Sequence, residues 1–408
     1  MSSPSKSPLM AALLAQSPSR RRLLASAGAA AAVAATAAAT SGCAPPPPPA
    51  AGAAKLDLPQ DVSATERLAK WANWTAYLDY DDKTKKYPTL EAFKKKTGMA
   101  VTYSEDIDDN DSYFNKIAPQ LRAGQDIDRD IFVFTDWMAN RVIREKLCQP
   151  LELIRMPHAA NLLEKLKDVS FDPGRQFSLT WQSGFAGIAY DKAKVGRDLK
   201  TIDDLWAPDL KGKVVVLSEY RDTLGLIMQS QGVDPSGPFT DAQFQAAADV
   251  VSKRIADGSI RRVKGNSYLQ DLQSGNAVAG IVWSGDIFVL RAETNNPNWT
   301  FLLPESGGML WSDNMMIPIT SRHRRNAEML MDYYYQPEVA AQVAAYVNYV
   351  CPVQGAQAEM EKIDPELAKS PYIFPTASFL AKNAKVFRAL SAAEEAKYGA
   401  IWAKVVGN

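Results

Sequence analysis

From about residue 67, short apolar runs alternate with amphipathic stretches along the chain. The first repeats of this pattern predict strands at 68–74, 99–103 and 131–134 and helices at 90–96, 113–122 and 137–146. Gly98 closes the first helix, since glycine commonly lies just after the end of a helix. Strands and helices that alternate at this spacing are typical of a parallel-type α/β sheet with right-handed crossovers.

A second set of α/β elements begins after Trp181. The same patterns predict strands at 187–190, 214–217 and 278–283 and a helix at 244–255. A chain of 408 residues is also longer than one compact core of ordinary size. Two α/β lobes leave a cleft between them, and ligands of open α/β sheets bind beyond the carboxyl ends of the strands. We therefore examine the side chains that follow predicted strands.

Residues 1–54 differ from the rest of the chain. Arginines 20–22 precede an alanine-rich apolar run at 25–40, and no acidic residue occurs in this segment. The arginine run resembles a twin-arginine export signal, and Thr40-Ser41-Gly42-Cys43 resembles a lipobox, although Thr40 stands where leucine is usual. An alanine-rich tail with a chance cysteine is the alternative.

The same segment predicts attachment to a membrane. A lipid on Cys43, followed by an extended tether at prolines 45–49, would hold a folded body at the outer face of the cytoplasmic membrane or in the periplasm. No other stretch approaches the ~18 uninterrupted apolar residues that span a bilayer. We predict that residues 1–54 are a signal and tether, outside the folded lobes.

Composition and charge narrow the class of protein. The chain is 46% hydrophobic, which indicates a globular fold, and its formal net charge is zero. Because residues 1–54 carry only basic charges, the remainder is mildly acidic. An acidic body lacks the basic surface that DNA or RNA needs, so nucleic-acid binding is not expected.

Few residues offer catalytic or metal chemistry. Neither a nucleophile motif nor a dinucleotide fingerprint occurs, so we predict neither an enzyme nor a cofactor. His158 and His323 are far apart in sequence, which argues against zinc. Cys148 and Cys351 are either two buried thiols or a disulfide, which an exported protein could keep.

Tryptophan recurs beside carboxylates near predicted strand ends. The pairs are Asp136 with Trp137, Trp283 with Asp286, and Trp311 with Asp313, while Trp74 stands near Tyr77 and Glu219 near Asp222. In a strand, Trp311 and Asp313 point to the same side. Aromatic rings that take methylenes and carboxylates that take ammonium groups suit a polyamine. As alternatives, Asp136 caps a helix, each tryptophan belongs to the core, and residues 106–111 form a solvated loop.

Several segments, in order, resemble the bacterial spermidine/putrescine-binding proteins over about residues 68–349. They are Asn73-Trp74-Thr75-Ala76-Tyr77, residues 93–98 with Val101, Asp130-Ile131 with Thr135, Val282-Trp283-Ser284-Gly285-Asp286, Gly307-Gly308-Met309-Leu310-Trp311-Ser312-Asp313 and Gln336-Pro337-Glu338-Val339-Ala340. The resemblance implies the type II periplasmic-binding-protein fold, with lobes at 66–181 plus about 314–350 and at 182–313 plus about 351–408.

The resemblance also implies roles for individual residues. It implies ligand-binding residues at Trp74, Thr75, Tyr77, Asp136, Glu219, Asp222, Trp283, Asp286, Trp311, Asp313 and Tyr349. In the family pattern, Asp286 matches the acidic residue of the putrescine-preferring members. The segment Thr135-Asp136-Trp137 departs from the serine or tyrosine of many relatives, and no register is found after about residue 356.

With the resemblance, these observations predict the monomeric substrate-binding component of an ABC importer for polyamines. The resemblance implies that it closes around its ligand and then meets a membrane permease. A sugar-binding protein would use the same aromatic walls, but the candidate carboxylates and the lack of an obvious cleft Arg or Lys favour a cationic ligand. A carbohydrate hydrolase is the third hypothesis and needs two carboxylates ~5 to 9.5 Å apart.

Overall fold

The computed structural model describes residues 58–407. The predicted export signal, Cys43 and the tether therefore lie outside the described residues. Within residues 58–407, no helix combines the length and apolar character needed to cross a bilayer.

The first α/β units form close to their predicted positions. Strand β1 (Leu68–Trp74) pairs in parallel with β2 (Ala100–Ile107), and β3 (Phe132–Thr135) follows. The helices here are α2 (Pro88–Thr97), α3 (Asn110–Arg122) and α4 (Asp136–Arg144). Helix α2 starts with proline and ends at Gly98, whose φ of 67° lies in the left-handed region that glycine tolerates.

Eight strands form a second sheet, in the order β10-β9-β4-β7-β5-β6, with β3 paired to β9 and β8 paired to β4. The further strands are β4 (Leu179–Asp191), β5 (Val214–Leu217), β6 (Ile260–Lys264), β7 (Ala279–Trp283), β8 (Trp299–Leu302), β9 (Gly308–Met316) and β10 (Ala384–Lys385). Strands β5, β6 and β7 pair in parallel, whereas β4 runs antiparallel to β7, β8 and β9. The predicted parallel pairing holds in the first set, where β1 and β2 run parallel and Trp71 forms a parallel bridge with Ile131, whereas β4 and β9 make the second sheet mixed.

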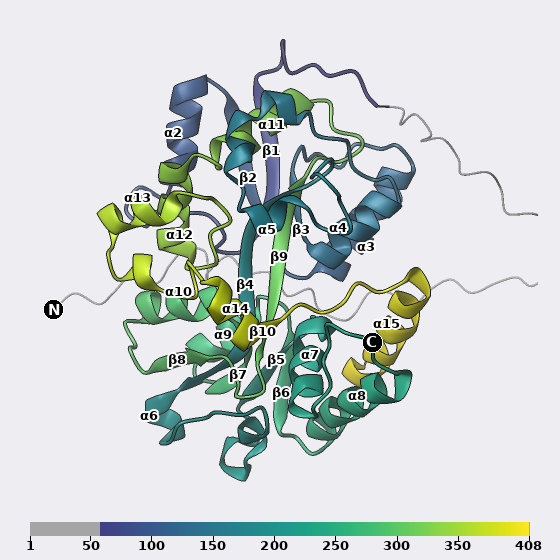
Figure 1. Ribbon diagram of the computed structural model, residues 1–408, viewed down its shortest axis with the longest axis vertical. Coiled ribbons are helices and arrows are strands. Elements are labelled where there is room, and N and C mark those ends of the chain that lie inside the picture. Colours follow the sequence, from purple (N-terminus) through teal and green to yellow (C-terminus); the bar gives the residue numbers. More distant parts are fainter. Residues whose placement is uncertain (1–57, 408) are drawn as a thin grey trace, which may run out of the picture. The chain divides into compact units, whose positions relative to one another are not determined.

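The long strands β4 and β9 join the two sets of α/β elements. The first half of β4 pairs with β9 and its second half with β7, while the last four residues of β9 pair with β3. Figure 1 shows β4 and β9 side by side. The sequence predicted only residues 187–190 of β4, because a strand buried along its whole length lacks polar and apolar alternation. The lobe boundaries stay a prediction.

The remaining helices follow these strands in sequence. They are α5 (Glu164–Lys167), α6 (Lys192–Val195), α7 (Tyr220–Ser230), α8 (Asp241–Ala256), α9 (Tyr268–Gln273), α10 (Ser284–Thr294), α11 (Arg324–Tyr333), α12 (Pro337–Val347), α13 (Ala356–Ile363), α14 (Ala377–Asn383) and α15 (Ala392–Val406). The C-terminal α15 packs on α8, where the rings of Tyr398 and Phe244 stack with centroids 4.1 Å apart.

Two open alternatives are decided by the fold. Cys148 and Cys351 are free buried thiols, so the disulfide alternative is wrong. Burial raises the pKa of Cys351 to about 12. The acidic run at 106–111 is not a solvated loop, because it spans the end of β2 and the start of α3. Within it, the Asp109 side chain caps α3 by accepting from the Ser112 N–H.

Candidate ligand-binding site

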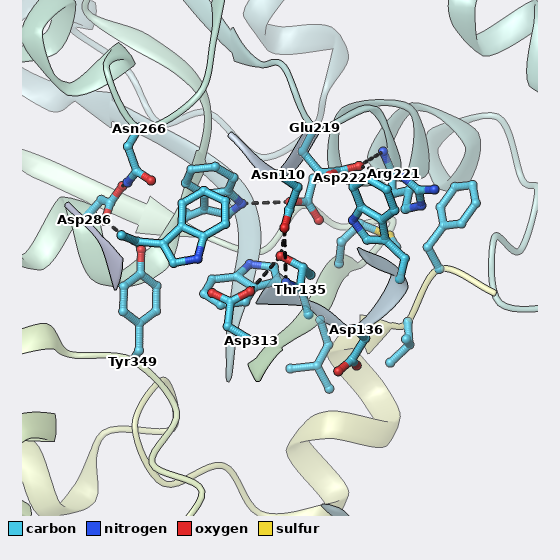
Figure 2. A pocket seen from close by; sticks show the side chains of 18 of the residues that line it. Asn110, Thr135, Asp136, Glu219, Arg221, Asp222, Asn266, Asp286, Asp313 and Tyr349 are labelled. Atoms are coloured by element: carbon cyan, nitrogen blue, oxygen red, sulfur yellow. Dashed lines mark hydrogen bonds and ion pairs between the residues drawn. The ribbon is translucent and has the colours of Figure 1, made fainter. Parts of the chain in front are cut away.

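One pocket lies where β1, β3 and β7 end and where α3, α4, α7 and α10 begin. All eleven side chains that the sequence singled out line it: Trp74, Thr75, Tyr77, Asp136, Glu219, Asp222, Trp283, Asp286, Trp311, Asp313 and Tyr349. Figure 2 shows Asp286 and Tyr349 toward one end, Glu219 and Arg221 toward the other, and Asp313 between them. The placement is a structural fact, and the binding role of these residues stays a prediction.

Asp313 is held by hydroxyl donors in the middle of the pocket. Tyr77 donates to Asp313 Oδ2 at 2.9 Å and Thr135 donates to Oδ1 at 2.7 Å. Asn110 Nδ2 in turn donates to Thr135 Oγ1 at 2.8 Å, which orients that hydroxyl. Among the described residues, no Lys or Arg forms an ion pair with Asp313, so this buried carboxylate has neutral partners only.

Asp286 has a similar environment in the first turn of α10. Tyr349 donates to its Oδ1 at 2.7 Å, and Tyr268 and Asn266 donate to its Oδ2 at 2.8 and 3.0 Å. The side chain is 5% exposed. Asp286 is thus a second buried acid whose hydrogen-bond partners are neutral.

The start of α7 brings three charged side chains to the pocket. Glu219 is the N-cap and accepts from the Arg221 N–H at 3.1 Å, and its Oε1 also lies 3.2 Å from Arg221 Nη1. The Arg221 guanidinium carbon lies 3.5 Å from the ring centroid of Trp137. Asp222 Oδ2 accepts from Trp283 Nε1 at 2.7 Å. The expectation of no cleft cation is therefore wrong, because Arg221 lines the pocket.

Asp136 lies at the edge of the pocket, and Figure 2 shows it apart from the other labelled carboxylates. Its Oδ1 accepts from Asn314 Nδ2 at 2.7 Å. The helix-cap alternative does not describe it, because Thr135 occupies the N-cap position of α4 and Asp136 is the first helical residue.

Burial raises the pKa of the pocket acids against the opposing effect of their hydrogen bonds. It raises the pKa of Asp313 to about 7 and that of Asp286 to about 6. The pKa of Glu219 rises to about 7 by burial, although Arg221 acts against this, and that of Asp136 rises to about 6 by burial. Burial and then the Glu219 charge raise the pKa of Asp222 well above its usual value. Charging these groups without a cation is costly.

Aromatic rings form the walls between the acids. Trp283 meets Trp74 and Trp311 edge to face, with centroids 6.2 and 6.3 Å apart, and Trp311 meets Tyr349 at 5.2 Å. Gly184 allows this arrangement, because a Cβ there would lie 2.4 Å from the Trp311 ring. The pocket therefore combines rigid apolar walls with several carboxylates.

Sequence reasoning missed nine lining residues: Asn110, Thr135, Trp137, Arg221, Asn266, Met309, Leu310, Val386 and Phe387. Two of them had a usable sequence signal. Trp137 stands directly after Asp136, and Thr135 lies in a segment that resembles the family. Val386 and Phe387 had none, because they come from the C-terminal segment after β10. Across residues 58–407, no group of three or more His, Cys, Asp or Glu side chains could hold a metal ion.

Comparison with known proteins identifies the family. Residues 88–375 match the family described as bacterial extracellular solute-binding protein. The chain belongs to this family. Among the relatives of this solute-binding protein, the spermidine/putrescine-binding periplasmic protein of Escherichia coli K12 is 25% identical over 75% of this chain and 82% of its own length. The putrescine/agmatine-binding protein of Pseudomonas aeruginosa is 25% identical over 79% of this chain and 89% of its own.

Solved structures share the fold. The substrate-binding protein PotD of Streptococcus pneumoniae has a TM-score of 0.66 at 24% identity, covering 83% of this chain and 98% of that one. The TpPotD lipoprotein of Treponema pallidum has a TM-score of 0.68 at 19% identity, covering 84% and 100%. The predicted type II periplasmic-binding-protein fold of this solute-binding protein is confirmed.

Proposed function

We propose that this solute-binding protein delivers polyamines such as putrescine or spermidine to an ABC importer and performs no chemistry on them. The observation that carries the proposal is the cluster of Asp222, Asp286 and Asp313, three buried acids inside aromatic walls. Of the described lining residues, only Arg221 is cationic, and its guanidinium already pairs with Glu219.

An alkyl diamine satisfies both parts of this pocket. Its ammonium groups supply the counter-charges that buried carboxylates lack, and its methylenes pack against Trp283 and Trp311. A neutral sugar would accept the same stacking but would leave the acids without counter-charge. The relatives named above, which are binding proteins for spermidine, putrescine or agmatine, agree with a polyamine.

A calorimetric panel tests the proposal. Purified residues 55–408 are titrated with putrescine, spermidine, agmatine, glucose and maltose at one salt concentration. We expect micromolar or tighter binding of at least one amine and none of the sugars. Sugar binding without amine binding would refute the polyamine function, and hydrolysis of an oligosaccharide would refute a function in binding alone.

Contacts between the predicted lobes support closure around the ligand. The backbone carbonyl of Asp108 accepts from the Asn266 N–H at 3.2 Å, and the Asp108 side-chain Oδ1 accepts from the Ser267 N–H at 2.9 Å. Next to it, Ser218 Oγ donates to Asp109 Oδ2 at 2.7 Å. Gly265 permits this approach, because a Cβ there would lie 2.1 Å from the Asp108 carbonyl oxygen. Ligand binding would then shift the protein toward the closed form.

Gly265→Ala should therefore weaken polyamine binding with little change in the melting temperature of the ligand-free protein. Overpacking costs about 1–3 kcal/mol, equivalent to about 5- to 150-fold in Kd. Gly399→Ala is the matched control, since a Cβ there meets nothing within 4 Å. Equal Kd values for Gly265→Ala and its parent would contradict the closed contact.

Binding should also depend on pH. Because the pKa values of Asp313 and Asp286 are raised to about 7 and 6, the folded apo protein binds more protons than the unfolded chain as pH rises from about 4 to 7. Apo stability should fall across this window. An ammonium ligand favours the ionised acids, so affinity should rise with pH, by about tenfold or more between pH 5 and pH 8.

Calorimetry at constant ionic strength checks this dependence, with proton release measured in two buffers of different ionisation enthalpy. A Kd that is constant from pH 5 to pH 8 would mean that the pocket acids are already ionised without ligand.

We further propose that the protein is exported as a monomer and anchored to the membrane through Cys43. The structurally similar TpPotD of Treponema pallidum is a lipoprotein, which agrees with this. Cys43→Ala should move the full chain from the membrane fraction to the soluble fraction with unchanged polyamine affinity, because none of the described residues that line the pocket is changed. Membrane attachment of the Cys43→Ala protein would show that another group anchors it.

A further inference from the structure

A larger cavity adjoins the pocket lined by Asp222, Asp286 and Asp313, which we call the acidic pocket. Its volume is about 620 Å³, against about 70 Å³ for the pocket. Apart from shared residues, its apolar walls come mainly from segments 163–171 and 375–380 and from Val350. We call it the apolar groove, with Leu163, Leu166, Val169, Phe171, Val350 and Leu380 as its defining residues. None of these six lines the acidic pocket.

The two cavities meet at a gap along one edge of β9. Strand β10 pairs with Gly308 and Met309, and β3 pairs with residues 313–316. In the described part of the chain, no strand pairs with residues 310–312 on this edge, while β4 covers the opposite edge. The gap is the place where side chains can line both cavities.

The side chains around this gap are the ones that the cavities share. Asp136 and Trp137 follow β3, Val386 and Phe387 follow β10, and Leu310 lies on β9 between them. Val386 is 46% exposed, so part of its side chain is free to contact a ligand. The junction thus combines one carboxylate with apolar surface that a ligand could cover.

We propose that the acidic pocket and the apolar groove form one extended site for polyamines that carry an apolar alkyl substituent on a terminal nitrogen. The unsubstituted ammonium lies between Asp286 and Asp313, the substituted ammonium lies beside Asp136, and the alkyl group occupies the groove. The five side chains that line both cavities and the charge of Asp136 among them carry this inference, which rests on the proposed polyamine function.

The placement of Asp136 agrees with this arrangement. Its Oδ1 accepts from Asn314, and no described residue pairs with it as a salt bridge. A secondary ammonium keeps its charge after alkylation, so it can still pair with this carboxylate. A pocket closed on all sides would instead exclude every N-substituted ligand by overlap.

Calorimetry with putrescine and its N-methyl, N-butyl and N-hexyl derivatives tests the extended site. Each methylene buried in the groove should tighten binding about three- to fourfold. N-hexylputrescine should therefore bind at least tenfold more tightly than N-methylputrescine. Equal or weaker binding of the hexyl compound overturns the inference, whereas failure of putrescine itself to bind refutes the proposed polyamine function.

Two variants in the apolar groove test whether the alkyl substituent gains its affinity there. Leu380→Gln and Leu163→Gln should each weaken N-hexylputrescine at least threefold and change putrescine less than twofold, because both residues line the groove alone. Ile154→Gln, at a side chain that is 93% exposed and lines neither cavity, is the control. If both variants fold and N-hexylputrescine still binds more tightly than N-methylputrescine by the same factor as in the parent, the alkyl group does not occupy the groove. If neither variant folds, the series of alkyl lengths measured on the parent protein decides.

Discussion

Replacing Asp313 with asparagine should raise the Kd for putrescine about 30-fold to a few thousand-fold while leaving the fold intact. The substitution keeps the shape of the side chain and removes its charge. Asp313 is 4% exposed and its partners Tyr77 and Thr135 are neutral hydroxyls, so a bound ammonium would be its only counter-charge among the described groups. Truncating one partner of a buried charge pair costs about 2–5 kcal/mol.

The control for this experiment is Asp249→Asn. Asp249 is exposed on α8, where it accepts from Gln245, and lies outside the pocket. Exposed charges contribute about 0–1 kcal/mol, so its Kd should change by less than about fivefold. An Asp313→Asn protein that binds putrescine as tightly as its parent, at the same salt concentration, would exclude Asp313 from the site.

Trp283→Leu is expected to have the second-largest effect, an increase in Kd of about 30- to 1000-fold, equivalent to about 2–4 kcal/mol. The Trp283 ring meets both Trp74 and Trp311, so its loss opens the aromatic wall. Its N–H also holds Asp222 at 2.7 Å, and the substitution leaves that buried carboxylate without this donor.

A second substitution separates these two contributions. Trp283→Phe keeps an aromatic face and removes only the donor to Asp222, so it should cost less than Trp283→Leu. Trp206→Leu, at a buried tryptophan outside the pocket, should lower the melting temperature and leave Kd unchanged. If Trp283→Leu behaves like Trp206→Leu, Trp283 is a core residue and does not contact the ligand.

Part of the acidic pocket could be predicted from local patterns in the sequence. Alternation in a strand places Trp311 and Asp313 on one face, and both line the pocket. Placement at strand ends likewise singled out Trp283 and Asp286, because helices that follow strands start at the ligand-binding edge of an α/β sheet. These positions depend on neighbours close in sequence, so the sequence can predict them.

The partners of the same residues depend on contacts across the chain. Thr135 donates to Asp313, 178 positions away, and Tyr77 does so across 236 positions. No local period encodes such pairs. Arg221 is a further case, because its guanidinium pairs with the neighbouring Glu219 but also stacks on Trp137, which comes from another element.

The sequence by itself determined the α/β elements near β1, β5 and β7, the family resemblance and eleven of the side chains that line the pocket, since each follows from local periodicity or a short motif. Only the tertiary structure decided that β4 and β9 make the sheet mixed, that the two cysteines stay apart, and that Val386 and Phe387 reach the pocket. These features arise where segments distant in the chain pack together, and packing of that kind leaves no regular spacing in the sequence.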